Sequence, residues 1–330
     1  MDPARFEPPL WLASPRLQSI LTSVGPRRSS VRRRAAPLLA ASREQLLDCG
    51  AGVRLAGQYA AQPRGAEELV LLLHGWEGSA DSLYLLSAGQ TLWERGYEVF
   101  RLNLRDHGAT HHLNPELFHS CRIAEVVGAV QAVQTMYPGR ALSLVGYSLG
   151  GNFVLRVAAR APAAGIRLRR VIAVSPVLDP VHTLASLEHG AWIYRRYFVQ
   201  KWRRSLVLKS QAWPKLYDRR ELLRHRSLTA MTEMLVQRYT EFQDLDSYLH
   251  GYAITGKALA GLAVSARVLS ALDDPIIPAV DLVRLASSSQ LKVITTRRGG
   301  HCGFLDHLAG PSWADRWLAA ELASAAGPAG

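Results

Sequence analysis

The stretch 142–151 constrains the fold of this 330-residue chain more than any other. It reads Leu-Ser-Leu-Val-Gly-Tyr-Ser-Leu-Gly-Gly, an apolar run that leads into a serine framed by glycines, and helix-forming residues follow it. The pattern predicts a strand, a sharp turn and a helix, with Ser148 held at the turn in a strained backbone geometry. Gly146 and Gly150 are expected there because strand and helix pass too close for a β-carbon. Ser148 is therefore a candidate nucleophile, and an ordinary tight turn is the alternative.

Short apolar runs alternate with helical patterns along the rest of the chain. Runs that are apolar throughout predict strands buried on both faces, as a parallel sheet requires. We expect such strands at 68–73, 97–104, 142–145, 171–174, 267–272 and 291–295. Helical spacing between them, as in 82–95 and 313–323, predicts an α/β fold with a mainly parallel, doubly wound sheet. Two β-rich segments, 44–48 and 53–59, predict an antiparallel hairpin at one end of this sheet.

The alternation stops between about residues 180 and 261, where aromatic residues concentrate and no buried strand is expected. A small helical insertion needs large side chains to build a core, so we expect a helical lid whose aromatic residues mostly pack together and partly line a ligand cavity. The predicted organisation is an N-terminal arm at 1–43, a first part of the α/β core at 44–179, the lid at 180–262, and a second part of the core at 263–330.

Two polar motifs follow the last two predicted strands. A serine hydroxyl becomes a nucleophile only beside a general base, and that base needs a carboxylate to fix its tautomer. Ligands of open α/β sheets lie at the carboxyl ends of the strands, where Asp274 and His301 are expected to join Ser148. Asp273, which is adjacent, and Asp179, at the end of the strand before the lid, are alternatives for the acid.

A tetrahedral intermediate also needs two hydrogen-bond donors for its oxyanion. One is expected to be the backbone N–H of Leu149, at the N-terminus of the helix after Ser148. The other is expected to be the N–H of Trp76, in the loop His74-Gly75-Trp76-Glu77-Gly78 that follows the first buried strand. We expect His74 to orient this loop and not to act as a second base.

The chain has 39 basic and 27 acidic residues, a formal net charge of +12. Such an excess is compatible with an anionic partner, but scattered arginines in an alanine- and arginine-rich chain indicate a compositional bias, so no nucleic acid is expected as a partner. The arginines at 27, 28 and 32–34 are expected to form a solvated face. Contact of this cluster with an anionic membrane surface is the alternative, and the lid pairs 195–196 and 203–204 could favour anionic esters or such a surface.

Composition also bears on compartment and cofactors. Three cysteines, which lie far apart without a Cys-x-x-Cys spacing, indicate a reducing compartment. No apolar stretch reaches about 18 residues, and the first twelve residues lack the apolar core of a signal peptide, so we expect a cytoplasmic protein. The histidine-rich stretch 106–112 does not match a metal-ligand pattern, and we expect no metal and no cofactor. The sequence gives no indication of oligomeric state.

These motifs resemble those of the YheT-like branch of the α/β-hydrolases, a group that also contains the lipid-active ABHD proteins of animals. The resemblance covers nearly the whole chain and rests on the segments 15–20, 74–78, 103–108, 112–114, 118–120, 146–152, 273–275 and 300–303. The order Ser148, Asp274, His301 is that of the α/β-hydrolase triad. The family usually has histidine where this chain has Arg16, and glycine where it has Asp106.

The resemblance implies a serine hydrolase that cleaves carboxylic esters of small molecules beneath a lid. Because the predicted lid is aromatic and no large exposed apolar face is indicated, we expect short- to medium-chain acyl esters or related lipids to be preferred. Two alternatives are an acyltransferase that uses the same acyl-serine and a non-catalytic binding protein on the same fold. The second alternative predicts the loss of a triad member, and none is lost.

Overall fold

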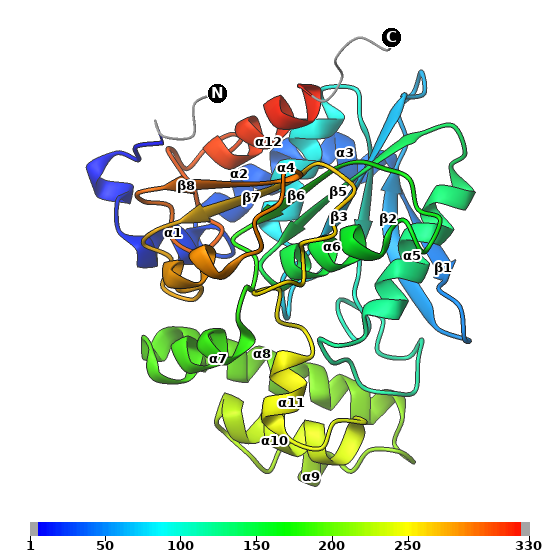
Figure 1. The fold of residues 1–330 in the computed structure, drawn as a ribbon, viewed down its shortest axis with the longest axis vertical. Coiled ribbons are helices and arrows are strands. Elements are labelled where there is room, and N and C mark those ends of the chain that lie inside the picture. Colours follow the sequence, from blue (N-terminus) through cyan, green and yellow to red (C-terminus); the bar gives the residue numbers. More distant parts are fainter. Residues whose placement is uncertain (1–5, 325–330) are drawn as a thin grey trace.

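The computed structural model describes residues 6–324, so residues 1–5 of the predicted arm and 325–330 of the predicted core lie outside the described part. Within residues 6–324 the strands form one eight-stranded sheet in the order β1-β2-β4-β3-β5-β6-β7-β8 (Figure 1). The strands are β1 (Ser42–Asp48), β2 (Arg54–Ala60), β3 (Glu68–Leu73), β4 (Glu98–Leu102), β5 (Ala141–Tyr147), β6 (Leu168–Val174), β7 (Ala266–Ala271) and β8 (Leu291–Thr296). The predicted mainly parallel sheet is confirmed.

The hairpin at the sheet edge differs from the prediction in one respect. β1 and β2 pair antiparallel, as expected, and β2 also pairs antiparallel with β4. Since β2 is reversed against both neighbours, β1 runs in the same direction as the parallel strands. Among the described strands, β2 alone runs against the others.

The apolar strands are buried on both faces because helices cover both sides of the sheet. In β3, Leu69 and Leu71 belong to one apolar cluster, while Val70 and Leu72 belong to the other. The first cluster includes α5 (Ile123–Met136) and α6 (Leu149–Arg160), and the second includes α4 (Leu83–Trp93) and α12 (Trp313–Ala323). Alternate residues of one strand therefore supply two cores, which explains why its sequence is apolar throughout.

The arm consists of short helices, η2 (Leu10–Leu12), α1 (Pro15–Leu21), α2 (Arg27–Arg34) and α3 (Ala36–Ala41). The arm packs on α4. The arginines of its basic cluster differ in burial, since some are buried or half-buried and others are exposed. Arg27 is buried and donates to Ser87 Oγ and the Gly310 carbonyl, and Arg34 donates to Ser87 and Thr91. The prediction of a solvated face is therefore wrong for Arg27 and Arg34, whose side chains bind the arm to the core.

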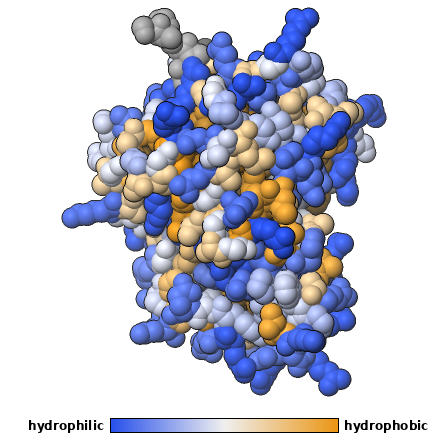
Figure 2. All heavy atoms as spheres, turned by 90° about the vertical axis from the view of Figure 1, so that its right-hand side faces the viewer, coloured by the Kyte–Doolittle hydropathy of each residue, from blue (hydrophilic) through white to orange (hydrophobic). Residues whose placement is uncertain are grey.

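The helical insertion between β6 and β7 contains five helices and no strand in residues 180–262. They are α7 (Pro180–His189), α8 (Trp192–Ala212), α9 (Arg219–Leu222), α10 (Leu228–Tyr239) and α11 (Leu245–His250). In Figure 1 they form the lower part of the molecule, beyond one end of the sheet. On the face shown in Figure 2, this part exposes mostly hydrophilic atoms, and hydrophobic atoms gather over the α/β core above it.

A buried ion pair joins the lid to the core. Lys209 of α8 donates from Nζ to Asp106 Oδ1 at 2.7 Å and to the carbonyls of Asn114 and Glu116. Asp106 has φ +56°, a backbone conformation that glycine adopts freely and that aspartate tolerates better than most residues. The position where the resemblance implies a glycine thus holds an aspartate in a glycine-like conformation, and its carboxylate binds the lid.

No helix in residues 6–324 combines the length and the apolar character needed to cross a membrane.

Candidate active site

Ser148 lies at the turn between β5 and α6 with φ +53° and ψ −121°. This strained conformation is the one that the sequence pattern predicts. A β-carbon on Gly146 would lie 2.2 Å from the Gly150 carbonyl oxygen, and one on Gly150 would lie 2.4 Å from the His74 carbonyl oxygen. The glycines therefore allow β5, α6 and the end of β3 to approach each other closely, which places the Ser148 hydroxyl above the sheet.

His301 connects Ser148 with Asp274. Its Nε2 lies 2.9 Å from Ser148 Oγ, and its Nδ1 lies 2.9 Å from Asp274 Oδ2. In the neutral ring these contacts assign the proton to Nδ1, which leaves Nε2 to accept from the serine hydroxyl. The other oxygen of Asp274 accepts from the N–H groups of Ile276 and Ile277, so the carboxylate is fixed on both sides.

The pKa of His301 reflects two opposing effects. Burial lowers the pKa, but the charge and hydrogen bond of Asp274, aided by the Cys302 thiol, raise the pKa well above its ordinary value. Stabilisation of the imidazolium is what a general base needs when it takes a proton from serine.

The arm holds the histidine loop in place, a role for which the sequence carries no signal. Ser19 Oγ accepts from the backbone N–H of His301 and donates to the Pro15 carbonyl. The fully buried Gln18 bonds both the carbonyl and the N–H of Leu305 through its side-chain amide. Gln18 and Ser19 belong to the segment 15–20, one of those that carry the family resemblance, and both bind the loop that carries His301.

The two alternative acids have other partners. Asp273 accepts from the N–H of Gly300. Asp179 caps the N-terminus of α7, and its carboxylate accepts from Arg284 Nη1 at 2.5 Å. Burial alone would raise the pKa of Asp179, but the hydrogen bond from Arg284 outweighs burial together with weaker contacts, and the pKa is lowered. In the described part of the chain neither carboxylate contacts the ring of His301.

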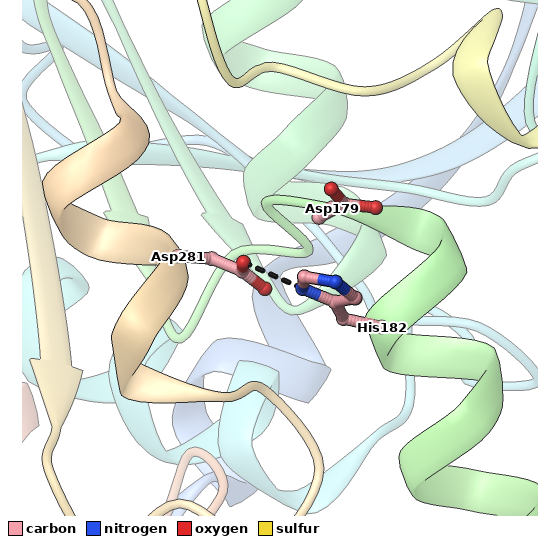
Figure 3. Close-up of side chains that lie close together, drawn as sticks. All are labelled: Asp179, His182 and Asp281. Atoms are coloured by element: carbon pink, nitrogen blue, oxygen red, sulfur yellow. Dashed lines mark hydrogen bonds and ion pairs between the residues drawn. The ribbon is translucent and has the colours of Figure 1, made fainter.

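Asp179 belongs to a charged cluster at the start of the lid (Figure 3), in which His182 Nδ1 lies 2.7 Å from Asp281 Oδ1. These three side chains are close enough to hold a cation. Arg284 Nη1 also contacts Asp179 and Asp281, so a guanidinium already compensates both carboxylates. The cluster connects α7 to the segment that follows β7.

The loop after β3 is fixed by histidines and by the lid. His74 Nε2 accepts from the Leu104 N–H, and its Nδ1 donates to the Gly75 carbonyl; burial lowers the pKa of His74 to about 4, so the ring is neutral. The N–H of Glu77 donates to His107 Nε2, and Lys201 of α8 donates to the Glu77 carbonyl. His74 thus occupies the loop-orienting position that the sequence predicts.

The N–H groups of Trp76 and Leu149 have no acceptor within residues 6–324. Both flank Ser148, where the oxyanion of an intermediate would form. The ring of Trp76 stacks on Phe198 of α8, with centroids 5.3 Å apart, and meets Trp202 edge-on. The lid aromatics therefore pack directly on the loop that carries one of the two predicted donors.

The described residues line two cavities that meet at Ser148. The larger has a volume of about 630 Å³ and is also bordered by His301, Trp76 and charged side chains of the arm and lid. The smaller has a volume of about 90 Å³ and extends between the core and the lid helices α7, α10 and α11. Its walls are mostly apolar, among them Leu149, Val177, Leu184, Leu187, Leu235, Leu249, Phe198, Trp202 and Ile276.

The chain matches a known family over most of its length. Residues 68–308 match the sequence profile described as alpha/beta hydrolase fold. The mouse (Mus musculus) phospholipase ABHD3 is 22% identical over 245 residues, which cover 72% of this chain and 58% of the mouse protein. The YheT protein of Escherichia coli (strain K12) is 23% identical over 248 residues, which cover 72% of this chain and 70% of that protein.

Solved structures share the fold at lower identity. The esterase Pf2001 of Pyrococcus furiosus aligns with a TM-score of 0.56 at 13% identity, over 86% of this chain and 91% of that chain. A bacterial membrane phospholipase A aligns with a TM-score of 0.58 at 17% identity, over 91% of this chain and 92% of that chain.

Proposed function

Because this chain belongs to the alpha/beta hydrolase family and its Ser148 and His301 are in hydrogen-bond contact, we propose that it cleaves carboxylic esters through an acyl-serine intermediate. The observation that carries the proposal is the continuous line of contacts from Ser148 Oγ through His301 to Asp274, each 2.9 Å long. A binding protein on the same fold would have no need for such an alignment.

In the proposed reaction, Ser148 Oγ attacks the ester carbonyl while His301 Nε2 takes its proton. The carbonyl oxygen becomes an oxyanion, which the N–H groups of Trp76 and Leu149 bind. His301 then gives the proton to the departing alcohol, and the acyl group stays on the serine. A water molecule, deprotonated by His301, attacks the acyl-serine. The bond between the acyl carbon and Ser148 Oγ then breaks, His301 returns the proton to Oγ, and the acid is released.

We assign the acyl part and the alcohol part of the substrate to different cavities, which meet at Ser148. The smaller cavity is apolar and suits the acyl chain, and the larger, more polar cavity suits the alcohol part. A volume of about 90 Å³ favours short- to medium-chain acyl groups. Transfer of the acyl group to a second alcohol would use the same intermediate.

The first prediction tests the nucleophile. A fluorophosphonate probe should label the wild-type protein and fail to label Ser148→Ala. The variant should also lose at least about 10³-fold in kcat/KM on aryl esters, because the nucleophile and its base act as a unit. Ser29→Ala changes an exposed serine of α2 that borders neither cavity and should keep both labelling and activity. Labelling of Ser148→Ala at the wild-type rate would reject the proposal.

A further inference from the structure

Basic side chains from two separate segments border the larger cavity. Arg28 and Arg32 come from α2 of the arm, and Lys201 and Arg204 come from α8 of the lid. All four line the cavity that also contains Ser148 and His301. We refer to these four residues as the basic rim.

The basic rim is not neutralised by carboxylates of the described chain. Arg28, Arg32, Lys201 and Arg204 have no ion pair within residues 6–324, and Lys201 donates to a backbone carbonyl. By contrast, three other arginines of the arm and lid have partners within the described chain. Arg34 pairs with Glu94, Arg195 pairs with Glu188, and Arg203 donates to two backbone carbonyls.

The acidic groups of the same cavity do not balance this charge. Asp81 pairs with Arg101, and Asp106 pairs with Lys209. Burial raises the pKa of Glu77 to about 8 against the opposing charge of Lys201, so this carboxyl carries less than a full negative charge at neutral pH. The larger cavity therefore carries an excess of positive charge within the same space as the nucleophile.

From this charge we propose that the basic rim binds a negatively charged group, a phosphate or a carboxylate, on the alcohol part of the ester substrate. The inference rests on the proposed ester hydrolysis, because the two cavities that meet at Ser148 decide which part of an ester lies beside the basic rim. The acyl chain occupies the apolar cavity, which leaves the charged cavity for the alcohol. Guanidinium groups bind phosphate and carboxylate oxygens through paired hydrogen bonds, and a basic cleft also attracts anions from solution.

Matched pairs of soluble esters test this inference. The first pair is 1-butyrylglycerol 3-phosphate and 1-butyrylglycerol, and the second is 4-(butyryloxy)benzoate and its methyl ester, each used below the concentration at which it aggregates. We expect the wild type to favour the anionic member of at least one pair by about tenfold or more in kcat/KM. The preference should shrink between 0.05 M and 0.5 M salt, because exposed charges are screened within about 10 Å at 0.1 M.

Variants of the basic rim should change the ratio of the two rates. We expect Arg28→Gln combined with Arg32→Gln, and separately Arg204→Gln, to lower the anionic-to-neutral ratio several-fold, mainly through KM for the anionic ester. Arg33→Gln and Arg196→Gln are the matched controls. They lie on the same two helices, are exposed and do not border the cavity, so the ratio should stay at the wild-type value.

The outcomes separate this inference from the proposed function. A ratio near one in both pairs, or a ratio that the rim variants leave unchanged, would overturn the inference while fluorophosphonate labelling and aryl-ester cleavage still support the hydrolase. Loss of binding to anionic phospholipid vesicles in the rim variants, without any change in the ratio, would also overturn it, since the rim would then serve a lipid surface. Absence of labelling and of all ester cleavage in the wild type would instead reject the proposed function.

Discussion

Asp274 is the acid whose position the structure favours, and this choice can be tested by a matched pair of variants. Asp274→Asn should lower kcat about 10⁴-fold, because an amide no longer holds His301 in the tautomer that accepts from Ser148. Asp179→Asn should cost much less activity, since Asp179 contacts Arg284 and not His301. Turnover of both variants is measured beside their circular dichroism, which shows whether the fold is kept. A larger loss in Asp179→Asn would place the acid at the end of β6.

The protonation of His301 predicts how activity depends on pH. The base must be neutral to take the serine proton, and contact with Asp274 raises the pKa of His301 well above 6.5 despite burial. Activity should therefore fall as pH decreases through that raised pKa. In Asp274→Asn the remaining activity should extend to lower pH, because the charge that raises the pKa is gone. The test is kcat/KM against pH for both proteins. An acid limb that stays in the same place in the variant would contradict it.

That Ser148, Asp274 and His301 lie together could be predicted because each follows a strand in a recognisable local pattern. Which of Asp274 and Asp179 contacts His301 could not be predicted, since Asp179 binds Arg284, which lies 105 residues away. The supporting role of Ser19 depends on a contact with a residue 282 positions away. Likewise, sequence alone does not tell Arg28, which borders the cavity, from Arg27, which is buried, because the two differ only in the face of α2 that they occupy.

At the scale of elements, the link between α8 and the loop after β4 predicts how firmly the lid is held. Lys209→Met leaves the buried Asp106 carboxylate without its charged partner, and such a loss costs about 3 kcal/mol or more of unfolding free energy. Urea unfolding measures this cost, and limited proteolysis of residues 180–262 shows whether the lid loosens first. Lys215→Met, at an exposed lid position, should change stability by no more than about 0.5 kcal/mol.

The loss of stability caused by Lys209→Met should depend on pH in a definite direction. Burial raises the pKa of Asp106 to about 6 even beside Lys209, and removal of Lys209 should raise it further. Protonation would then relieve the unpaired carboxylate, so Lys209→Met should be less destabilising at pH 5 than at pH 8. The double variant Asp106→Gly with Lys209→Met should be more stable at pH 8 than Lys209→Met alone. Equal losses at both pH values would argue against the ion pair as the anchor.

Elements with a strong hydrophobic pattern were predictable and others were not. The parallel strands and α12 follow from apolar runs and helical spacing, and their observed ends differ from the predicted ones by a few residues at most. The helix α2 has the sequence Arg-Arg-Ser-Ser-Val-Arg-Arg-Arg, which has a single apolar side chain, Val31. It is held by Arg27 and Arg34 bonds to α4 and by the single buried Val31, which packs in one apolar cluster with Leu83 and Leu86 of α4. One apolar residue makes no periodic pattern, so periodicity gave no signal for this helix.

At the scale of the whole molecule, the site is completed by segments that lie outside the sheet. The arm fixes the His301 loop and supplies half of the basic rim, and the lid closes the apolar cavity and stacks on Trp76. The strand ends supply Ser148, Asp274 and His301, and residues of the arm and lid border the cavities that lead to them. Under the proposed function, the arm and lid would therefore select among ester substrates. Substrate preference should therefore change with lid variants that leave the catalytic contacts intact.

The volume of the apolar cavity predicts the preferred acyl chain. About 90 Å³ holds roughly three groups of the size of a water molecule, as many as the carbons that follow the carbonyl in a butyryl chain. We therefore expect kcat/KM for aryl esters to rise from acetate to about butyrate and then to level off or fall. Each methylene that becomes buried contributes up to about 0.8 kcal/mol, or roughly a fourfold change in rate. Leu235→Ala, on α10, enlarges the cavity and should move the optimum to longer chains. Leu206→Ala removes an equally buried lid leucine that borders neither cavity and should leave the optimum in place. A rate that is flat from acetate to decanoate in all three proteins would mean that the acyl chain does not occupy this cavity.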